Sequence, residues 1–214
     1  MDIVFSHLPE VADGLWITLR IAVLSFLGAL VLGTIVAVMR ISPIAPLRAV
    51  GLVYVEFFRN IPLLTLLFLI VFGLPDIGVL LDLIPRVTIG MALFSGAFVC
   101  EAVRTGINTV PLGQAEAARS IGLPFGASLR YVILPQAFRS MVQPLTNVWI
   151  GTLIGTSIAA SVGIFDLTAQ GKQLNNVYAG GLPLFATIAA IYVVMCLASG
   201  AFGSWIERRV KILR

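Results

Sequence analysis

Ionisable side chains occur within two apolar stretches of this chain, where they could bind a solute or pair with one another. Glu56 and Arg59 lie near the start of one stretch, and Glu101 and Arg104 lie near the end of another. A charge at membrane depth is costly, so such a residue marks either a transport pathway or a paired structural site. The i, i+3 spacing within each pair is typical of ion pairs on one helix face. Both interpretations stay open for Glu101 and Arg59.

The composition is that of an integral membrane protein. Of the 214 residues, 59% are hydrophobic and 11% are charged, and the mean hydropathy is +1.03. A membrane-spanning helix needs roughly 20 apolar residues, which leaves room for about five spans and no separate soluble domain. The acidic N-terminal segment and the long apolar run after it predict no cleaved signal peptide. The basic residues form no aromatic-interleaved patch, which argues against a nucleic-acid partner.

We therefore expect an all-α integral membrane protein that forms a single domain over residues 1–214. The apolar stretches predict spans at residues 15–39, 50–72, 87–103, 141–162 and 182–205. Pro62 is able to kink the second span, and Gly151 and Gly155 form a G-x-x-x-G pair that could bring another helix close. The amphipathic stretch at residues 73–86 could be a short interfacial helix or an ordinary loop.

The distribution of positive charge predicts the orientation. One set of loops and span ends carries most of the basic residues, namely Arg40, Arg48, Arg104, Arg119, Arg130, Arg139, Arg208, Arg209, Lys211 and Arg214. The opposite set carries little besides Arg86 and Lys172. Because Lys and Arg accumulate in cytoplasmic loops, we expect the N-terminus outside and the C-terminus in the cytoplasm.

Motifs for catalysis are missing from the sequence. His7 is the only histidine, and neither an H-E-x-x-H nor a G-x-S-x-G motif occurs. Cys100 and Cys196 lie far apart within apolar runs, which favours packing over metal or redox chemistry. No phosphate-binding loop occurs, so ATP would have to be hydrolysed elsewhere. We expect no enzyme, no catalytic residue, no metal and no cofactor in this chain; an ATP-independent transporter is an alternative, although no inverted repeat supports it.

A polar segment, "GQAEAARSIGLPFGASLRYVILP", interrupts the apolar sequence at residues 113–135. Glu116 suits the positive N-terminal end of a helix dipole, and Gly122 can end that helix. Pro124 would begin a second short helix. Such a pair of helices is either an amphipathic interfacial loop or a docking element that presents Glu116 and Arg119 to a partner.

The spacing within this segment resembles the signature of the permease subunits of bacterial ABC importers. The matching residues are Glu116, Ala117, Ala118, Gly122, Val132, Leu134 and Pro135. Further blocks resemble the polar amino acid permeases of that superfamily: "RNIPLL", "GAFVCEAVRTGI", "GQAEAARSIGL" and "LPQAFR". The chain is identified as a member of this family by resemblance, which implies the type I ABC importer permease fold.

The resemblance also implies partners and a location. Residues 113–126 would be the coupling segment, in which Glu116, Ala117, Ala118, Arg119 and Gly122 meet a groove of a cytoplasmic ATPase. Two such ATPase subunits would bind the ATP and Mg. A second permease subunit would complete the pore in the bacterial plasma membrane, surrounded by lipid, and an extracytoplasmic binding protein would deliver the substrate.

Substrate-pathway residues follow from the same resemblance. It implies that Glu101, Thr156 and Ser157 lie near a central cavity, and Arg59 is the further candidate from its position. Many relatives have Lys-Asp or Lys-Asn where this chain has Ile154 and Gly155. That difference disfavours a cationic substrate and favours a different permease as partner. The sequence most resembles actinobacterial glutamate permeases; glutamine, aspartate or a basic amino acid are the alternatives.

Overall fold

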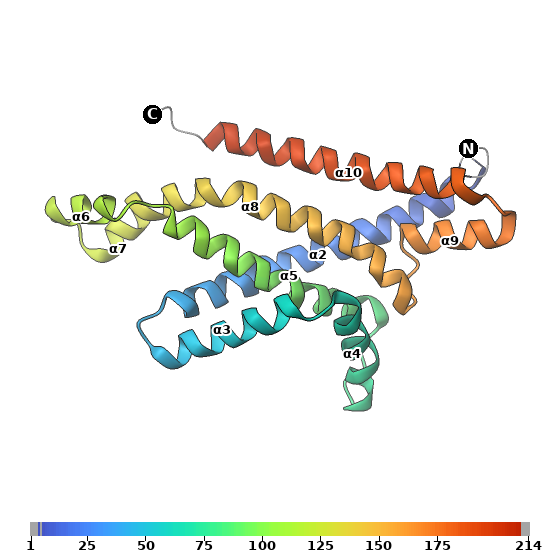
Figure 1. Ribbon diagram of the computed structural model, residues 1–214, viewed down its shortest axis with the longest axis horizontal. Helices are drawn as coiled ribbons and strands as arrows, with labels where there is room; N and C mark the ends of the chain where they lie inside the picture. Colours follow the sequence, from blue (N-terminus) through green and yellow to red (C-terminus); the bar gives the residue numbers. More distant parts are fainter. Residues whose placement is uncertain (1–3, 5, 211–214) are drawn as a thin grey trace.

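The computed structural model describes residues 4 and 6–210, and this part of the chain is helical and contains no strand (Figure 1). Its α-helices, with a π-helical turn (η1) and a 3₁₀ helix (η2), are α2 (Leu8–Ile41), α3 (Ala45–Asn60), α4 (Leu63–Asp76), α5 (Leu83–Asn108), α6 (Leu112–Ser120), α7 (Phe125–Ser128), η1 (Leu129–Ile133), α8 (Leu134–Gly155), η2 (Thr156–Val162), α9 (Leu167–Tyr178) and α10 (Gly181–Val210).

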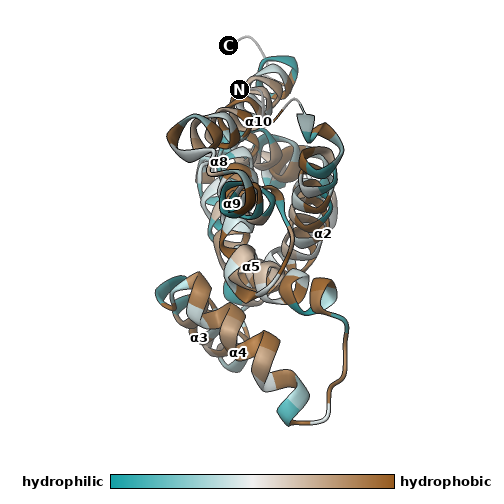
Figure 2. Ribbon diagram, turned by 90° about the vertical axis from the view of Figure 1, so that its right-hand side faces the viewer, coloured by the Kyte–Doolittle hydropathy of each residue, from teal (hydrophilic) through white to brown (hydrophobic). Residues whose placement is uncertain are grey.

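Long apolar helices make up most of the molecule. Within the described residues, four helical stretches are long and apolar enough to cross a membrane: Leu8–Ile41, Leu83–Asn108, Gly126–Val162 and Gly181–Val210. Figure 1 shows α2, α5, α8 and α10 extended along the long axis of the molecule. Large hydrophobic side chains are exposed along α2 and α10, among them Val31, Val38, Val194 and Leu197, as lipid contact requires. Figure 2 shows hydrophobic residues along most of α4 as well. The expected all-α membrane fold is confirmed.

Helices α2 and α5 form the most extensive contact in the bundle. They approach closely at Gly33, where an added Cβ would lie 2.5 Å from the carbonyl oxygen of Gly96. Helix α3 packs on α5, and the Tyr54 hydroxyl donates a 2.6 Å hydrogen bond to the Leu93 carbonyl. Small residues permit such close packing where no hydrophobic effect drives helices together. Helices α2, α3 and α5 therefore form one closely packed unit.

The single span expected at residues 50–72 is instead two helices, α3 and α4, which meet at an angle of 105°. Pro62 has no backbone N–H to continue the helix, and its ring disfavours helical backbone at the preceding residue. Ile61 is accordingly extended, with φ −86° and ψ 135°. If this bent pair is counted as one span, the described residues contain five candidate spans. The possible kink at Pro62 is thus a complete break.

The remaining helices extend beyond the apolar runs that predict them. The stretch expected at residues 141–162 starts already at Gly126 and ends in a 3₁₀ helix. Gly163, with φ 94°, ends it. Residues 73–86, where a short interfacial helix and an ordinary loop were the alternatives, form no separate helix: residues 73–76 end α4, residues 83–86 begin α5, and residues 77–82 between them are not helical. Hydropathy underestimates helix length because polar and charged residues at span ends reach the interface.

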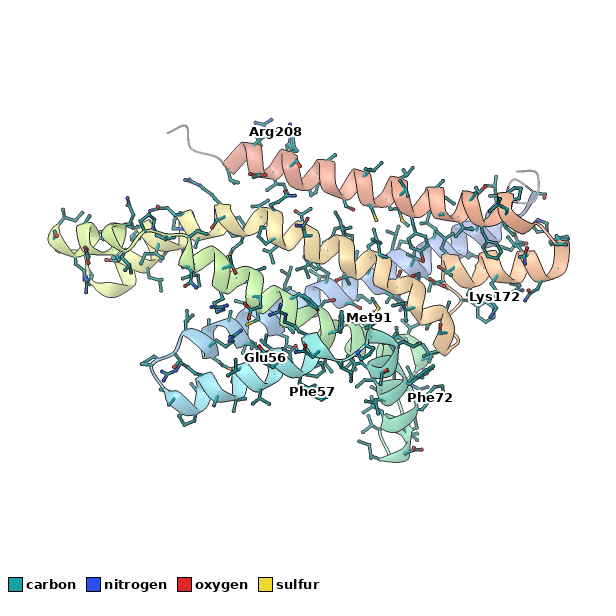
Figure 3. All side chains as sticks on the ribbon, in the orientation of Figure 1. Glu56, Phe57, Phe72, Met91, Lys172 and Arg208 are labelled. Carbon is teal, nitrogen blue, oxygen red and sulfur yellow. The ribbon has the colours of Figure 1, made fainter. Side chains whose placement is uncertain are left out.

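The segments that carry most of the basic residues lie at one end of the bundle. Figure 1 places the end of α2, helices α6 and α7 and the end of α10 at one end of the molecule, and the start of α2 and α9 at the other. Figure 3 shows Lys172 at the end with few basic residues. Lys211 and Arg214 lie outside the described residues. Most of the described arginines thus lie at one end of the bundle. Which end faces the cytoplasm stays a prediction.

Candidate functional site

Glu101 lies at the centre of a cluster of arginines. Its carboxylate pairs with Arg40 from the end of α2, with Arg104 one turn along α5 at 2.8 Å, and with Arg59 from the end of α3 at 3.8 Å. The Glu101 side chain is 20% exposed and that of Arg40 is 14% exposed. One carboxylate therefore joins the ends of α2 and α3 to α5.

The i, i+3 ion pair that the spacing allows for Glu101 and Arg104 is present. The one that it allows for Glu56 and Arg59 is absent from the described ion pairs. Glu56 is exposed on α3 (Figure 3) and accepts a long hydrogen bond from Asn60. Arg59 instead turns toward α5, where its guanidinium lies 5.8 Å from the centre of the Phe98 ring. Of the two acidic residues, only Glu101 is part of the charged cluster.

A cavity of about 330 Å³ opens beside this cluster, between α4, α5 and α8. Its volume falls in the range of small-molecule sites. The lining residues are Leu63, Met91, Phe94, Ser95, Phe98, Asn147, Val148, Gly151 and Thr152. Phe98 links the cavity to the arginine cluster, because its ring also contacts Arg59. The cavity is thus an apolar recess with a positively charged neighbour.

Asn147 is the polar group of the cavity with unused hydrogen-bonding capacity. The other polar pair satisfies itself, since Ser95 and Thr152 share a 2.8 Å hydrogen bond. No hydrogen bond involves the Asn147 carboxamide within the described residues. A carboxamide can both donate and accept, which suits an amino acid ligand. Sequence analysis missed Asn147; its only signal was an amide within an apolar stretch, and the same stretch also contains Gln143.

Thr156 and Ser157 do not line this cavity. Thr156 is fully buried, and its hydroxyl donates to the Leu153 carbonyl at 2.7 Å. The Ser157 hydroxyl likewise donates to the Ile154 carbonyl at 2.7 Å. Both hydroxyls satisfy the backbone where the α-helix tightens into η2. Of the four pathway candidates, the structure brings Arg59 and Glu101 together and leaves these two elsewhere.

The predicted G-x-x-x-G contact takes a different form. A Cβ on Gly155 would meet the Leu63 and Met91 side chains at 3.2 and 3.6 Å, and one on Gly151 would meet nothing within 4 Å. Neither glycine lies against the backbone of another helix among the described residues. Gly151 instead leaves one wall of the cavity open.

A second buried polar cluster surrounds Asp166, in the loop between η2 and α9. Its carboxylate accepts hydrogen bonds from the Ala169 N–H at 2.9 Å and from the Tyr192 hydroxyl at 3.1 Å. Burial raises the pKa of the Asp166 carboxyl, and these hydrogen bonds oppose the shift. Nearby, the Leu167 N–H donates to the Thr18 hydroxyl at 3.1 Å. This cluster joins α2, α9 and α10 and is structural in geometry.

The polar segment folds as the sequence predicts, into two short helices outside the apolar bundle. Glu116, Ala117 and Arg119 are exposed on α6, whereas Ala118 is buried against the rest of the segment. Gly122 ends α6 with φ 81°. Its N–H donates to the Arg119 carbonyl at 2.9 Å, and the Leu123 N–H donates to the Ala118 carbonyl at 3.1 Å. This pair of bonds is a Schellman motif, which needs a left-handed residue and so favours glycine.

Two large apolar side chains are exposed on this segment. Leu112 is 83% exposed and Ile121 is 77% exposed, at the two ends of α6. The helix lies beyond the ends of α5 and α8 in Figure 1, away from the apolar surface of the bundle. Exposed apolar groups beside charged ones are typical of a protein-binding surface.

Metal binding has no support in the described residues, where no group of three or more His, Cys, Asp or Glu side chains comes together. The sites that remain are the cavity with its arginine cluster and the exposed face of α6.

Comparisons with known proteins agree on one family. Residues 29–212 match the family model described as "Binding-protein-dependent transport system inner membrane component". The chain is 35% identical over 211 residues to a probable glutamine ABC transporter permease protein of Bacillus subtilis, which covers 99% of this chain and 98% of the relative. It is 36% identical over 205 residues to a glutamate transport system permease protein of Corynebacterium glutamicum, which covers 90% of each chain.

A solved structure is also similar over nearly the whole length. It is a crystal structure of an amino acid ABC transporter with histidines, which superposes with a TM-score of 0.90 at 35% identity. The match covers 96% of each chain.

The Glu101 cluster generates a first prediction. Glu101→Gln leaves Arg40, Arg59 and Arg104 without their shared counter-charge, so we expect unfolding in detergent to become easier by about 2–4 kcal/mol. Thermal unfolding followed by tryptophan fluorescence measures this change. Glu56→Gln is the matched control and should leave the midpoint unchanged, because Glu56 is exposed and belongs to no described ion pair. Equal midpoints for both variants would contradict the structural role of Glu101.

Proposed function

We propose that this chain transports glutamate. It belongs to the family described as binding-protein-dependent transport system inner membrane component, and it is a permease subunit of an amino acid ABC importer. It would form half of a pore in the bacterial plasma membrane, with its N-terminus outside and its C-terminus in the cytoplasm. The observation that carries the substrate proposal is the excess of positive charge beside the cavity.

The charge excess follows from the ion pairs around Glu101. Three arginines share one carboxylate, which leaves two positive charges unbalanced within the cluster. Arg59 is the most exposed of the three, at 42%, and it contacts Phe98 on the cavity wall. A substrate carboxylate near Arg59 would gain a charge-assisted interaction that water would otherwise screen.

The cavity lining supports the same choice. It contains no acidic residue, and Glu101 is already engaged by arginines. A cationic side chain would therefore find no free carboxylate there, which would leave its charge poorly compensated. Neutral Asn147 can bind an amide as well as a carboxylate, so glutamine is the second candidate. The named relatives include both a glutamine and a glutamate permease, and they do not choose between the two.

Uptake with charge variants tests the substrate. Cells that carry this gene with its neighbouring transport genes should take up labelled glutamate, and excess unlabelled glutamate or aspartate should block this uptake more than glutamine or arginine. Asn147→Asp places a negative charge in the cavity lining, so glutamate uptake should fall by about tenfold or more. Glutamine uptake, where present, should fall less.

A control separates charge at the site from damage to the helix. Gln143→Glu makes the same amide-to-carboxylate change on α8, at a position outside the cavity lining. It should leave glutamate uptake intact. Uptake blocked by glutamine or arginine in preference to acidic amino acids would overturn the glutamate proposal and leave the importer function in place.

The exposed face of α6 supports a coupling role for residues 113–126. We infer that Glu116, Ala117 and Arg119 contact a cytoplasmic ATPase, together with the exposed Leu112 and Ile121. That ATPase would bind the ATP and Mg, with two copies per importer. Ala118 and Gly122 would act indirectly: Ala118 anchors the helix, and Gly122 sets the direction in which the chain leaves it.

Reversal of one charge on α6 tests this coupling. Glu116→Lys changes an exposed side chain, so the permease should fold and reach the membrane, while substrate-dependent uptake falls by at least tenfold. Gly122→Ala should also reduce uptake, because alanine is less favourable than glycine by about 1–2 kcal/mol in left-handed backbone. Gly73→Ala, on α4 and outside the coupling segment, has open space around the added Cβ and serves as a control for the same substitution elsewhere. Normal uptake by Glu116→Lys would contradict the docking role.

A different permease chain is the proposed partner across the pore. The departure at Ile154 and Gly155 leaves this subunit without the charged residues that many relatives have there, and a second permease could supply them. An extracytoplasmic binding protein would deliver the substrate to the pair.

Purification tests the heterodimer directly. When this chain is tagged and co-expressed with its neighbouring permease, the detergent-solubilised complex should contain both chains in equal amounts, as weighed by native mass spectrometry. Expression of the tagged chain alone is the control. A stable complex of identical chains that excludes the neighbour would refute this assignment.

A further inference from the structure

A long groove of about 750 Å³ runs between α2, α8 and α10, apart from the cavity described above. It is lined almost entirely by apolar side chains, namely Val23, Phe26, Leu27, Leu30, Phe138, Val142, Leu145, Thr146, Trp149, Ala198, Ser199, Phe202, Gly203 and Ile206. Helix α8 forms its floor, because it contacts both other helices while α2 and α10 make few contacts with each other. The groove therefore opens to the surroundings between α2 and α10.

The groove is a fixed feature because polar contacts hold α10 to α8. The Trp149 indole N–H donates to the Ser199 hydroxyl at 2.9 Å. Gly203 lies so close to Thr146 that even a Cβ there would clash. The Trp149 ring also packs edge-on against Phe26, with centroids 5.4 Å apart. These contacts make an indole and a phenyl ring the inner wall of the groove.

Positive charge lies where the groove approaches the basic end of the molecule. On α8, Arg139 lies three residues before Val142 and seven before Thr146, which puts it on the same helix face. On α10, Arg209 follows Phe202 by seven residues and so lies on the same helix face. Its guanidinium carbon lies 5.4 Å from the centre of the Trp205 ring. No described ion pair involves either arginine.

Arg208 lies beside Arg209 in sequence but belongs to another face of α10. Arg208 follows Ser199 by nine residues, and at 100° per residue this places it on the side of α10 opposite to Ser199 and the groove. Figure 3 shows Arg208 on the side of α10 away from α8. The acidic Glu207 reduces the local charge, but Arg139, Arg208 and Arg209 together still outweigh it.

We propose that this groove binds an anionic phospholipid, whose acyl chain lies against Trp149 and Phe26 and whose phosphate is bound by Arg139 and Arg209. An apolar channel that ends at two arginines is complementary to this amphiphile in both polarity and charge. Basic pockets between membrane helices are a known type of site for anionic headgroups. The proposal rests on the membrane location and not on the identity of the transported substrate.

The lining of the groove favours a lipid chain. The hydroxyls of Thr146 and Ser199 donate to backbone carbonyls of their own helices, and the Trp149 N–H donates to Ser199, so these polar lining groups are already engaged. A lipid of the surrounding bilayer supplies both the apolar chain that this lining suits and the anionic headgroup that Arg139 and Arg209 suit.

Tryptophan quenching by brominated lipids tests the site in the full chain. With Trp16→Phe and Trp205→Phe, Trp149 becomes the sole tryptophan, and the chain is placed in phosphatidylcholine vesicles. Phosphatidylglycerol with brominated acyl chains should quench Trp149 at a several-fold lower mole fraction than brominated phosphatidylcholine. Each arginine is expected to contribute about fivefold to this preference.

Charge variants locate the headgroup. Arg139→Gln and Arg209→Gln should each reduce the preference for phosphatidylglycerol several-fold, whereas Arg208→Gln should keep it, because Arg208 faces away from the groove.

Equal loss of the preference in all three variants would indicate general attraction of anionic lipid to the surface and would overturn the site. Equal quenching by both lipids would indicate bulk lipid, and no quenching would indicate that protein covers the groove; either result refutes the proposal. Each comparison is made between two lipids on one folded sample.

Discussion

The pairing of Glu101 with three arginines is the interaction that organises the centre of the molecule. In hydrocarbon each of these charges would be costly alone, and one shared carboxylate gives all three arginines a partner. Arg40 ends α2, Arg59 ends α3, and Glu101 lies on α5 beside both. The cluster therefore fixes the depth at which three helices meet, and Gly33 lets α2 and α5 come close enough to form it. Since the arginines outnumber the glutamate, the same cluster leaves positive charge beside the cavity.

The second constraint is the absence of water, which requires every buried polar group to find a partner within the protein. Thr156 and Ser157 donate to backbone carbonyls, and Ser95 pairs with Thr152. Among the described residues, Arg86 Nε and Thr88 Oγ1 are the buried side-chain atoms without a hydrogen-bond partner. Asn147 differs from both, because its carboxamide is exposed on the cavity wall and is therefore accessible to a ligand.

Local chemistry made part of this structure predictable from sequence. Gly122 ends α6 because the left-handed conformation suits glycine, and Pro62 interrupts a span because proline cannot continue a helix. Both effects act over a few neighbouring residues. The pairing of Arg40 with Glu101 joins residues 61 positions apart and leaves no local signal. The same holds for Asn147, whose role depends on α4 and α5 facing it, and for Thr156, whose burial depends on packing. Long-range packing therefore decides which polar residues line the cavity.

The connection between α6 and the cavity follows from chain continuity. Helix α6 leads through α7 and the π-helical turn η1 directly into α8, and residues Gly126–Val162 form one helical stretch. That same stretch carries Asn147 and Gly151 on the cavity wall and Trp149 on the lipid groove. A rigid helix transmits displacement along its axis, whereas a π-helical turn is a place where it can bend. A partner that pulls on α6 would thus move the polar wall of the cavity against α5, where Glu101 holds the arginines in place.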